Sequence, residues 1–223
     1  MKRVGKLIAD NLKNVNDDIA KACERVGRSP SEVKLVAVSK TWPADKIREA
    51  YEAGQKVFGE NYTTEALDKM EELRDLDIEW HFIGGLQSKK VKSIAHKFSL
   101  IHSVDRMSLV EELEKRSQKP QDILVQVNFE SEETKSGVAP DEANILIQQI
   151  EQSDILNLKG LMVMPPLEAS EHLQKKVFEK VRQFREAHNL LELSMGTTHD
   201  YNLAIEYGST MIRVGTAIFG QRS

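Results

Sequence analysis

The chain has little cysteine, no long apolar run and no large excess of charge. Cys23 is its single cysteine in 223 residues, so no disulfide can form within the chain. No apolar stretch approaches the roughly 18 residues that a membrane span needs. The formal net charge is −4 and the lysines are scattered, which argues against a nucleic-acid surface. These absences lead us to expect a cytoplasmic protein with no membrane or nucleic-acid partner.

The composition suits one compact domain. With 40% hydrophobic residues, a chain of this length can bury a full core, and no linker-like segment divides it. The first fourteen residues, MKRVGKLIADNLKN, lack the apolar core and cleavage site of a signal peptide. We therefore expect a single domain over residues 1–223, acting as a monomer. Cys23 should be a packed thiol on the apolar face of the first helix.

Strand-like and helix-like patterns alternate along the chain. A first helix is indicated by Ile8, Leu12, Val15, Ile19, Ala22 and Val26, with Gly27 placed to end it. Eight strands are then expected at residues 33–40, 56–58, 79–83, 99–102, 123–128, 158–163, 191–195 and 211–214. Helical patterns lie between them. Pro43, Asp105 and Pro140 should begin helices, one should span about residues 86–95, and residues 59–61 should form a turn. This order predicts an α/β fold, a (β/α)₈ or TIM barrel with an extra N-terminal helix.

Lys40 stands at the carboxyl end of the first strand, in the phrase VSKTWP. The residues before it are continuously apolar, as in a strand buried on both faces of a parallel sheet. A lysine there is partly withdrawn from water, where its neutral amine costs less than in solution. A neutral lysine condenses with an aldehyde to give a Schiff base. Alone, Lys40 would be read as a solvated lysine at a strand end.

Two later stretches, LSMGTTHD and IRVGTAIFG, each run from a strand into a turn of glycine and threonine. Glycine lets backbone amides approach an anion, and a threonine at a helix start offers a hydroxyl beside the positive end of the helix dipole. A (β/α)₈ barrel often keeps a phosphate site after strands seven and eight. We interpret Gly196-Thr197-Thr198 and Gly215-Thr216 as two candidate phosphate-binding turns, although either turn alone could be ordinary turn chemistry.

The distinctive polar phrases all follow strands. They are SK at 39–40, GEN at 59–61, HFIGGLQ at 81–87, NFESEETKSG at 128–137, MGTT at 195–198 and RVGT at 213–216. In a barrel these positions gather at one mouth, which is the catalytic or binding face. In the fourth phrase, Glu132, Glu133 and Lys135 should form a solvated loop, which could act as a lid.

In this order, VSKTWP, FGEN, WHFIGGLQSKK, VNFESEETKSG, GLMVMP, LSMGTTHD and RVGTAIFG resemble the pyridoxal phosphate homeostasis protein family. These proteins are related to the barrel of alanine racemase, of fold type III among proteins that bind pyridoxal 5′-phosphate (PLP). The resemblance implies that PLP is the cofactor and that Lys40 is the Schiff-base lysine. It also implies that Arg213 faces the pyridine nitrogen, that Thr198, Gly215 and Thr216 hold the phosphate, and that Asn61 lines the pocket.

Three positions depart from the family pattern. Thr197 and Thr198 stand where the family usually has Met-Ser, which keeps a hydroxyl. Gly85 replaces a proline, which would loosen the loop after strand three. Lys89 replaces an asparagine and gives a Lys89-Lys90 pair, which leaves the role of that loop open.

The histidines offer a competing interpretation. His81, His102 and His199 lie on strands or after them, so a metal-dependent barrel hydrolase is conceivable. No pair has the close HxH or HxxxH spacing of metal ligands, and we therefore expect no metal site. His81 alternates with Trp80 and Phe82, so it should point into the barrel, either packed there or bordering the cofactor.

The sequence therefore predicts a PLP-binding barrel that buffers or delivers the cofactor to apo PLP-dependent enzymes, with no dedicated turnover reaction. The alternative is a racemase-like enzyme that uses Lys40 as one acid or base. A two-base racemase needs a second group, and of the tyrosines only Tyr62 and Tyr201 are expected near the mouth.

Overall fold

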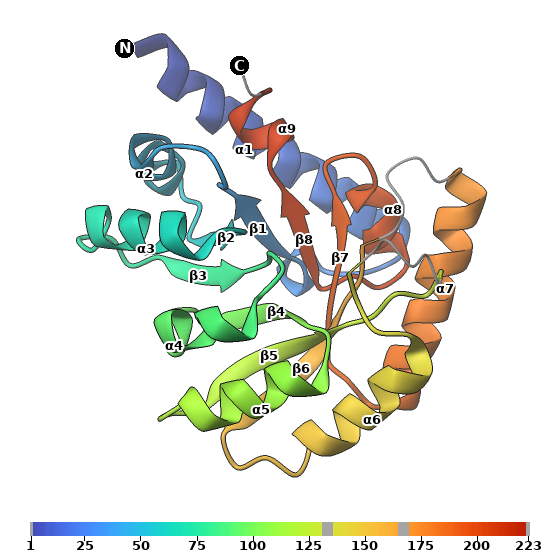
Figure 1. Ribbon diagram of the computed structural model, residues 1–223. Coiled ribbons are helices and arrows are strands. Elements are labelled where there is room, and N and C mark those ends of the chain that lie inside the picture. The colour runs from blue at the N-terminus through green and yellow to red at the C-terminus, as the bar shows by residue number, and fades with distance from the viewer. Residues whose placement is uncertain (1, 131–135, 165–169, 222–223) are drawn as a thin grey trace.

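The computed structural model describes residues 2–130, 136–164 and 170–221. Within them, eight parallel strands close into a barrel in sequence order (Figure 1). The strands are β1 (Lys34–Val38), β2 (Val57–Glu60), β3 (Glu79–Phe82), β4 (Leu100–Val104), β5 (Gln121–Gln126), β6 (Leu156–Met162), β7 (Glu192–Thr197) and β8 (Met211–Val214). The predicted TIM barrel is confirmed.

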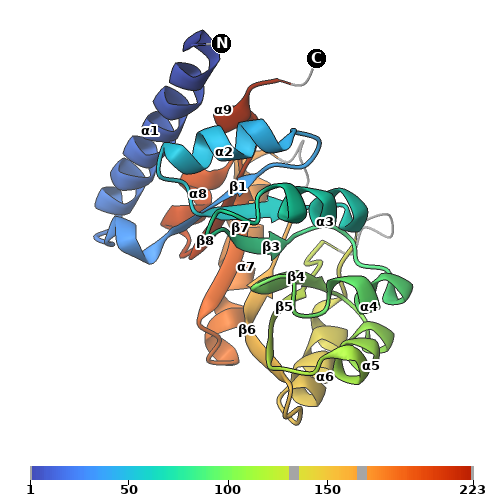
Figure 2. The ribbon, with the colours of Figure 1, turned by 90° about the vertical axis from the view of Figure 1, so that its left-hand side faces the viewer.

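Helices surround the barrel and alternate with its strands. They are α1 (Lys2–Arg25), α2 (Ala44–Glu52), α3 (Thr63–Glu72), α4 (Val91–Ile94), α5 (Met107–Arg116), α6 (Pro140–Ile150), α7 (Glu171–Ala187), α8 (Tyr201–Glu206) and α9 (Thr216–Phe219), with 3₁₀ turns η1 (Pro30–Glu32) and η2 (Ser88–Lys90). The extra N-terminal helix is α1, which lies outside the barrel against α2, α8 and α9 (Figures 1 and 2).

The apolar face of α1 explains its position. Ile8, Leu12, Val15, Ile19, Ala22 and Cys23 are all buried in the main core. Cys23 is fully buried, which confirms the packed thiol, and burial raises the pKa of this thiol. Val26 lies beyond the helix and is 40% exposed, so it does not belong to the face. Across the described residues, no helix combines the length and apolar character that crossing a bilayer would require.

Two apolar clusters follow from the alternation of side chains along each strand. The larger one fills the space between strands and helices and includes Phe58, Phe82 and Phe178. The smaller one is formed by Val36, Leu100, Leu124, Met162 and Met211 from five strands, and it fills part of the barrel interior. The rest of that interior is polar, which matters for the site.

Several boundaries differ from the predicted ones. Gly59 and Glu60 belong to β2 and not to a turn. Arg106 occupies the position before α5, while the carboxylate of Asp105 accepts a hydrogen bond from Arg106 and caps nothing. The helix predicted over residues 86–95 is reduced to η2 and the single turn α4, and the left-handed backbone of His96 (φ 66°) follows it.

Candidate functional site

Lys40 lies two residues beyond β1 and is half-buried. The turn that carries it is fixed on both sides. Before it, the Ser39 hydroxyl donates to Glu60 Oε1 at 2.7 Å and the Ser39 carbonyl accepts from Lys69 Nζ at 2.8 Å. After it, the Thr41 amide donates to Glu65 Oε1 at 2.5 Å, with Thr41 in the left-handed region at φ 67°. These contacts hold the backbone of Lys40 in one conformation.

A buried ionic cluster supplies those contacts. Lys69 on α3 donates to Glu60 Oε1 at 2.8 Å and to Glu65 Oε1 at 2.5 Å. Glu60 is fully buried and Lys69 is 5% exposed, and burial raises the pKa of Glu60. We name Glu60, Lys69 and Glu65 the Lys40 clamp. This cluster was not predicted from the sequence, although a glutamate in a buried strand followed by a lysine nine residues later is a signal of such a pair.

The turn after β7 has the expected form. Gly196 has φ 96°, and a Cβ there would lie 2.7 Å from the Ala204 Cβ, so only glycine fits. The hydroxyl and amide of Thr197 both donate to Asp200 Oδ1, at 2.9 and 2.6 Å. That leaves Thr198 as the hydroxyl of this turn that is not committed to Asp200. Helix α8 then begins at Tyr201 and is closed by Gly208 (φ 90°).

The turn after β8 lies between the turn after β7 and the end of β1. The Gly215 amide donates to Thr198 Oγ1 at 3.4 Å. On its other side, a Cβ on Gly215 would lie 3.3 Å from the Val38 carbonyl oxygen at the end of β1. Thr216 begins α9, in which the amides of Ile218 and Phe219 donate to the Gly215 carbonyl, so the amides of Thr216 and Ala217 are the ones that have no acceptor within the helix. The predicted phosphate residues are thus brought together beside the strand that leads to Lys40.

Arg213 lies on β8, between β1 and β7 in the barrel. It pairs with Val36 on one side and Thr197 on the other. Its guanidinium donates to Ser194 Oγ at 2.5 Å and to the Val163 carbonyl at 2.9 Å. Arg213 is 4% exposed, and burial lowers its pKa to about 10, so it stays cationic at neutral pH.

Asn61 follows β2 at the same mouth. Its Oδ1 is buried and has no hydrogen-bond partner among the residues described. The backbone is close-packed here, because a Cβ on Gly84 would lie 2.1 Å from the Asn61 carbonyl oxygen. A cavity of about 270 Å³ opens beside Asn61, lined also by Tyr62, Thr63, Thr64, Phe82, Gly85, Gln87 and Lys90.

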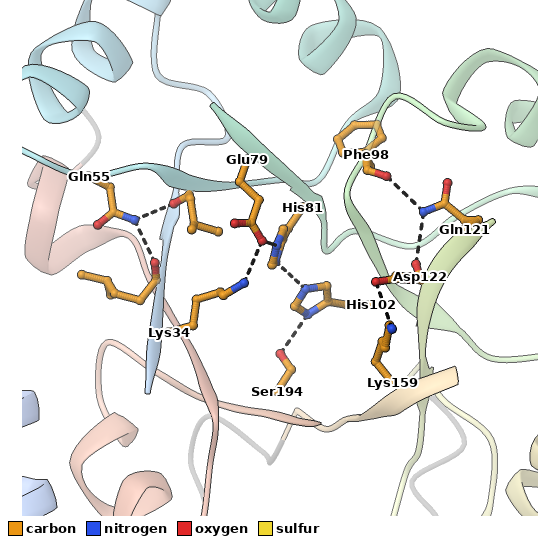
Figure 3. Close-up of polar contacts among 12 residues, drawn as sticks. Lys34, Gln55, Glu79, His81, Phe98, His102, Gln121, Asp122, Lys159 and Ser194 are labelled. Atoms are coloured by element: carbon orange, nitrogen blue, oxygen red, sulfur yellow. Dashed lines mark hydrogen bonds and ion pairs between the residues drawn. The ribbon is translucent and has the colours of Figure 1, made fainter. Parts of the chain in front are cut away.

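His81 lies on β3 with its side chain inside the barrel. It is fully buried inside the barrel, and both of its ring nitrogens bond to protein: Nε2 to Glu79 Oε1 at 2.8 Å and Nδ1 to His102 Nε2 at 3.0 Å (Figure 3). Of the two roles considered for this inward-pointing side chain, the geometry matches the packed one. In the strand register His81 pairs with Gly59, which pairs with Val38 at the end of β1.

The remaining predictions have mixed outcomes. Tyr201 does not serve the mouth, because its hydroxyl donates to Asp18 Oδ2 of α1 at 3.1 Å. A Cβ on Gly85 would meet nothing within 4 Å, so no close contact requires glycine there. Lys89 and Lys90 are exposed on η2.

The suggested lid residues Glu132, Glu133 and Lys135 lie outside the described residues. In the described ranges, no three histidine, cysteine, aspartate or glutamate side chains gather as metal ligands.

Comparison with known proteins identifies the family. Residues 11–223 match the family described as alanine racemase, N-terminal domain. The pyridoxal phosphate homeostasis protein of Aquifex aeolicus (strain VF5) is 44% identical over 222 residues, covering 96% of this chain and 97% of that protein.

Solved structures extend the comparison. PipY of Synechococcus elongatus PCC7942, solved with PLP bound, is 37% identical with a TM-score of 0.84, covering 96% of this chain and 100% of that one. Alanine racemase from E. faecalis is 15% identical with a TM-score of 0.69, over 93% of this chain and 58% of that one, which shows the shared fold alone. The chain therefore belongs to the alanine racemase N-terminal domain family and, within it, to the pyridoxal phosphate homeostasis proteins.

Proposed function

We propose that this chain binds PLP, holds it as a Schiff base on Lys40, and as a monomer buffers the cofactor or delivers it to apo PLP-dependent enzymes. The observation that carries the proposal is the meeting of three neighbouring strands, where Gly215 lies between Val38 and Thr198. Lys40 follows the first of these strands. The PLP-bound structure of PipY, a relative of similar length, supports the proposal.

The groups at this meeting point match those of PLP. The phosphate is a dianion, and the hydroxyls of Thr198 and Thr216 are suitable donors to it. Asn61 offers a buried oxygen that still needs a hydrogen bond. When bound, PLP supplies an aldehyde for a lysine amine and a ring that withdraws electrons.

Arg213 favours a carrier over an enzyme. Its guanidinium is cationic at neutral pH and would donate a hydrogen bond to the ring nitrogen, which disfavours protonation there. Enzymes that use the ring as a strong electron sink often place a carboxylate at that position. The site is thus suited to reversible holding of PLP, with weak support for carbanion chemistry.

A racemase-like activity is the alternative. It needs an acid or base on the face of the substrate opposite Lys40. Tyr201 is committed to Asp18, which leaves Tyr62, a side chain that is 54% exposed beside the cavity at Asn61. A racemase-like mechanism would therefore depend on Tyr62 as its second group.

Delivery can be tested directly. Holoprotein freed of excess PLP is mixed with an apo PLP-dependent enzyme, and the recovered activity of the acceptor is followed. Lys40→Ala should fold but carry no PLP to transfer, while Lys97→Ala, a change at an exposed lysine before the amino end of β4, should transfer normally. Equal delivery by Lys40→Ala would overturn the proposal.

The enzyme alternative is decided by incubating the holoprotein with single amino acids in deuterated water. We expect at most a single exchange of the α-proton and no sustained loss of chirality. Many turnovers on one amino acid, abolished in Lys40→Ala, would instead establish a racemase-like enzyme.

A further inference from the structure

A continuous file of hydrogen bonds crosses the barrel interior and ends at Arg213. Its members are Lys34, Glu79, His81, His102, Ser194 and Arg213. Figure 3 shows the first five pointing toward one another within the ring of strands. We call these six residues the interior file. They come from β1, β3, β4, β7 and β8, so the file links the amino end of the barrel to the candidate site.

The direction of each hydrogen bond in the interior file follows from the Glu79 carboxylate, near the end opposite Arg213. A carboxylate only accepts, so the Nε2–H of His81 must donate to Glu79 at 2.8 Å. The Nδ1 of a neutral His81 then accepts from the Nε2–H of His102 at 3.0 Å. The Nδ1 of His102 accepts in turn from the Ser194 hydroxyl at 2.9 Å. Ser194 therefore presents its lone pairs to the N–H of Arg213.

Burial keeps this order in place. His81, His102 and Ser194 are fully buried, and burial lowers the pKa of both histidines, so each is neutral at pH 7. Hydrogen bonds from His81 and Lys34 lower the pKa of Glu79 to about 2, so this carboxylate stays charged. Every side chain in the middle of the file has its polar atoms paired, which a buried polar network requires.

We propose that Glu79, His81 and His102 are positioning residues for Arg213, acting through Ser194. By fixing the Ser194 hydroxyl as an acceptor, they orient the guanidinium and leave its remaining N–H donors for the ring nitrogen of a bound pyridine. The inference rests on the proposed PLP binding, and it adds a set of residues that never touch the cofactor but adjust its environment. Its distinctive consequence is that a change near the floor of the barrel alters the cofactor at the mouth.

Nitrogen-15 NMR of the histidine rings tests the proton order without any cofactor. In ligand-free protein at neutral pH, His81 and His102 should both be neutral with the proton on Nε2. Their signals are assigned by substituting each histidine in turn. A proton on Nδ1 of either ring, or a charged ring, would overturn the proposed order.

Glu79→Gln tests the coupling, because a glutamine amide can donate to His81 Nε2 and so permit the reverse order. Asp122→Asn is the matched control. Asp122 is also near the amino end of its strand, pairs with Lys159 at 3.5 Å, and has a side chain as exposed as that of Glu79, 37% in each case (Figure 3). Glu79→Gln should shift the absorption maximum of bound PLP and weaken PLP binding about two- to tenfold, the size of one weakened hydrogen bond. Asp122→Asn should change neither.

Ser194→Ala breaks the interior file at its other end and covers the case in which Glu79→Gln fails to fold. Its control is Ser103→Ala, which removes a buried hydroxyl that has no hydrogen-bond partner among the described residues. Ser194→Ala should shift the absorption maximum of bound PLP, and Ser103→Ala should not. An unchanged spectrum in folded Glu79→Gln and Ser194→Ala would overturn the positioning role. Failure of the unmodified protein to bind PLP would instead overturn the proposed function, while the ring-nitrogen signals would still decide the proton order.

Discussion

At the scale of single residues, the candidate phosphate site depends on which threonine hydroxyls are not already bonded to an aspartate. The neighbouring residues Thr197 and Thr198 make different hydrogen bonds. The Thr197 hydroxyl donates to Asp200, while Thr198 Oγ1 accepts from the Gly215 amide. The family resemblance could point to Thr198, but only the structure separates it from Thr197. The sequence does not specify which of two adjacent hydroxyls an aspartate three residues later will bind.

Removing a hydroxyl that holds the phosphate should discriminate between PLP and pyridoxal. A hydrogen bond to a charged group contributes about 1.5–3 kcal/mol. Thr198→Ala and Thr216→Val should therefore each weaken PLP binding by roughly one to two orders of magnitude and leave binding of unphosphorylated pyridoxal nearly unchanged. Titrations of both ligands provide the measurement.

Thr197→Ala is the matched control for that prediction, because its hydroxyl is committed to Asp200. It should affect PLP and pyridoxal equally. Equal losses of both ligands in Thr198→Ala and Thr216→Val would show that these residues do not hold the phosphate.

At the scale of helices and strands, the alternation of patterns was enough to predict the barrel. The exceptions have local causes. The pattern predicts Gly59 in a turn, yet it is a strand residue whose missing Cβ makes room for Val36 and Ile83. The interior file joins residues far apart in sequence, such as His102 and Ser194, 92 positions apart. No local pattern reveals such partners, although polar residues at inward positions of apolar strands are a usable signal.

The Lys40 clamp ties α3 to the end of β1, and its loss should be costly. Lys69→Met leaves the fully buried Glu60 without its cation. Breaking a buried pair from one side costs about 3–5 kcal/mol, so the free energy of unfolding should fall by that amount. Denaturant unfolding measures it, and PLP binding should weaken as the Lys40 turn loosens.

Two further variants make the test of the clamp specific. Lys69→Met combined with Glu60→Leu should recover much of the lost stability, because no uncompensated charge remains. Lys13→Met, which removes an exposed pair with Asp17, should leave the unfolding midpoint unchanged. A loss for Lys69→Met no larger than that for Lys13→Met would contradict the importance of the clamp.

At the scale of the whole molecule, the buried histidines make stability depend on pH. The pKa values of His81 and His102 are lowered in the folded state, whereas the ordinary value is about 6.5. Below about pH 6.5 the unfolded chain gains protons that the folded chain does not bind. Stability should therefore fall as the pH is lowered, by up to about 1.4 kcal/mol per pH unit for each histidine.

Urea unfolding from about pH 7.5 to about pH 5 measures this slope. His102→Gln should reduce it, because one of the two buried rings no longer titrates. The depressed pKa of Glu79 contributes separately, since its stabilisation is present above about pH 4.5 and is lost as the pH falls toward 2. A slope that His102→Gln leaves unchanged would contradict a neutral, buried His102.

The central claim is that Lys40 carries PLP. Borohydride reduction of the holoprotein fixes the cofactor to the lysine that holds it, and peptide mass spectrometry then locates the added pyridoxyl mass. We predict that this mass lies on the peptide containing Lys40 and is absent in folded Lys40→Ala. Finding it only on another lysine, such as the exposed Lys89 or Lys90, would contradict the account.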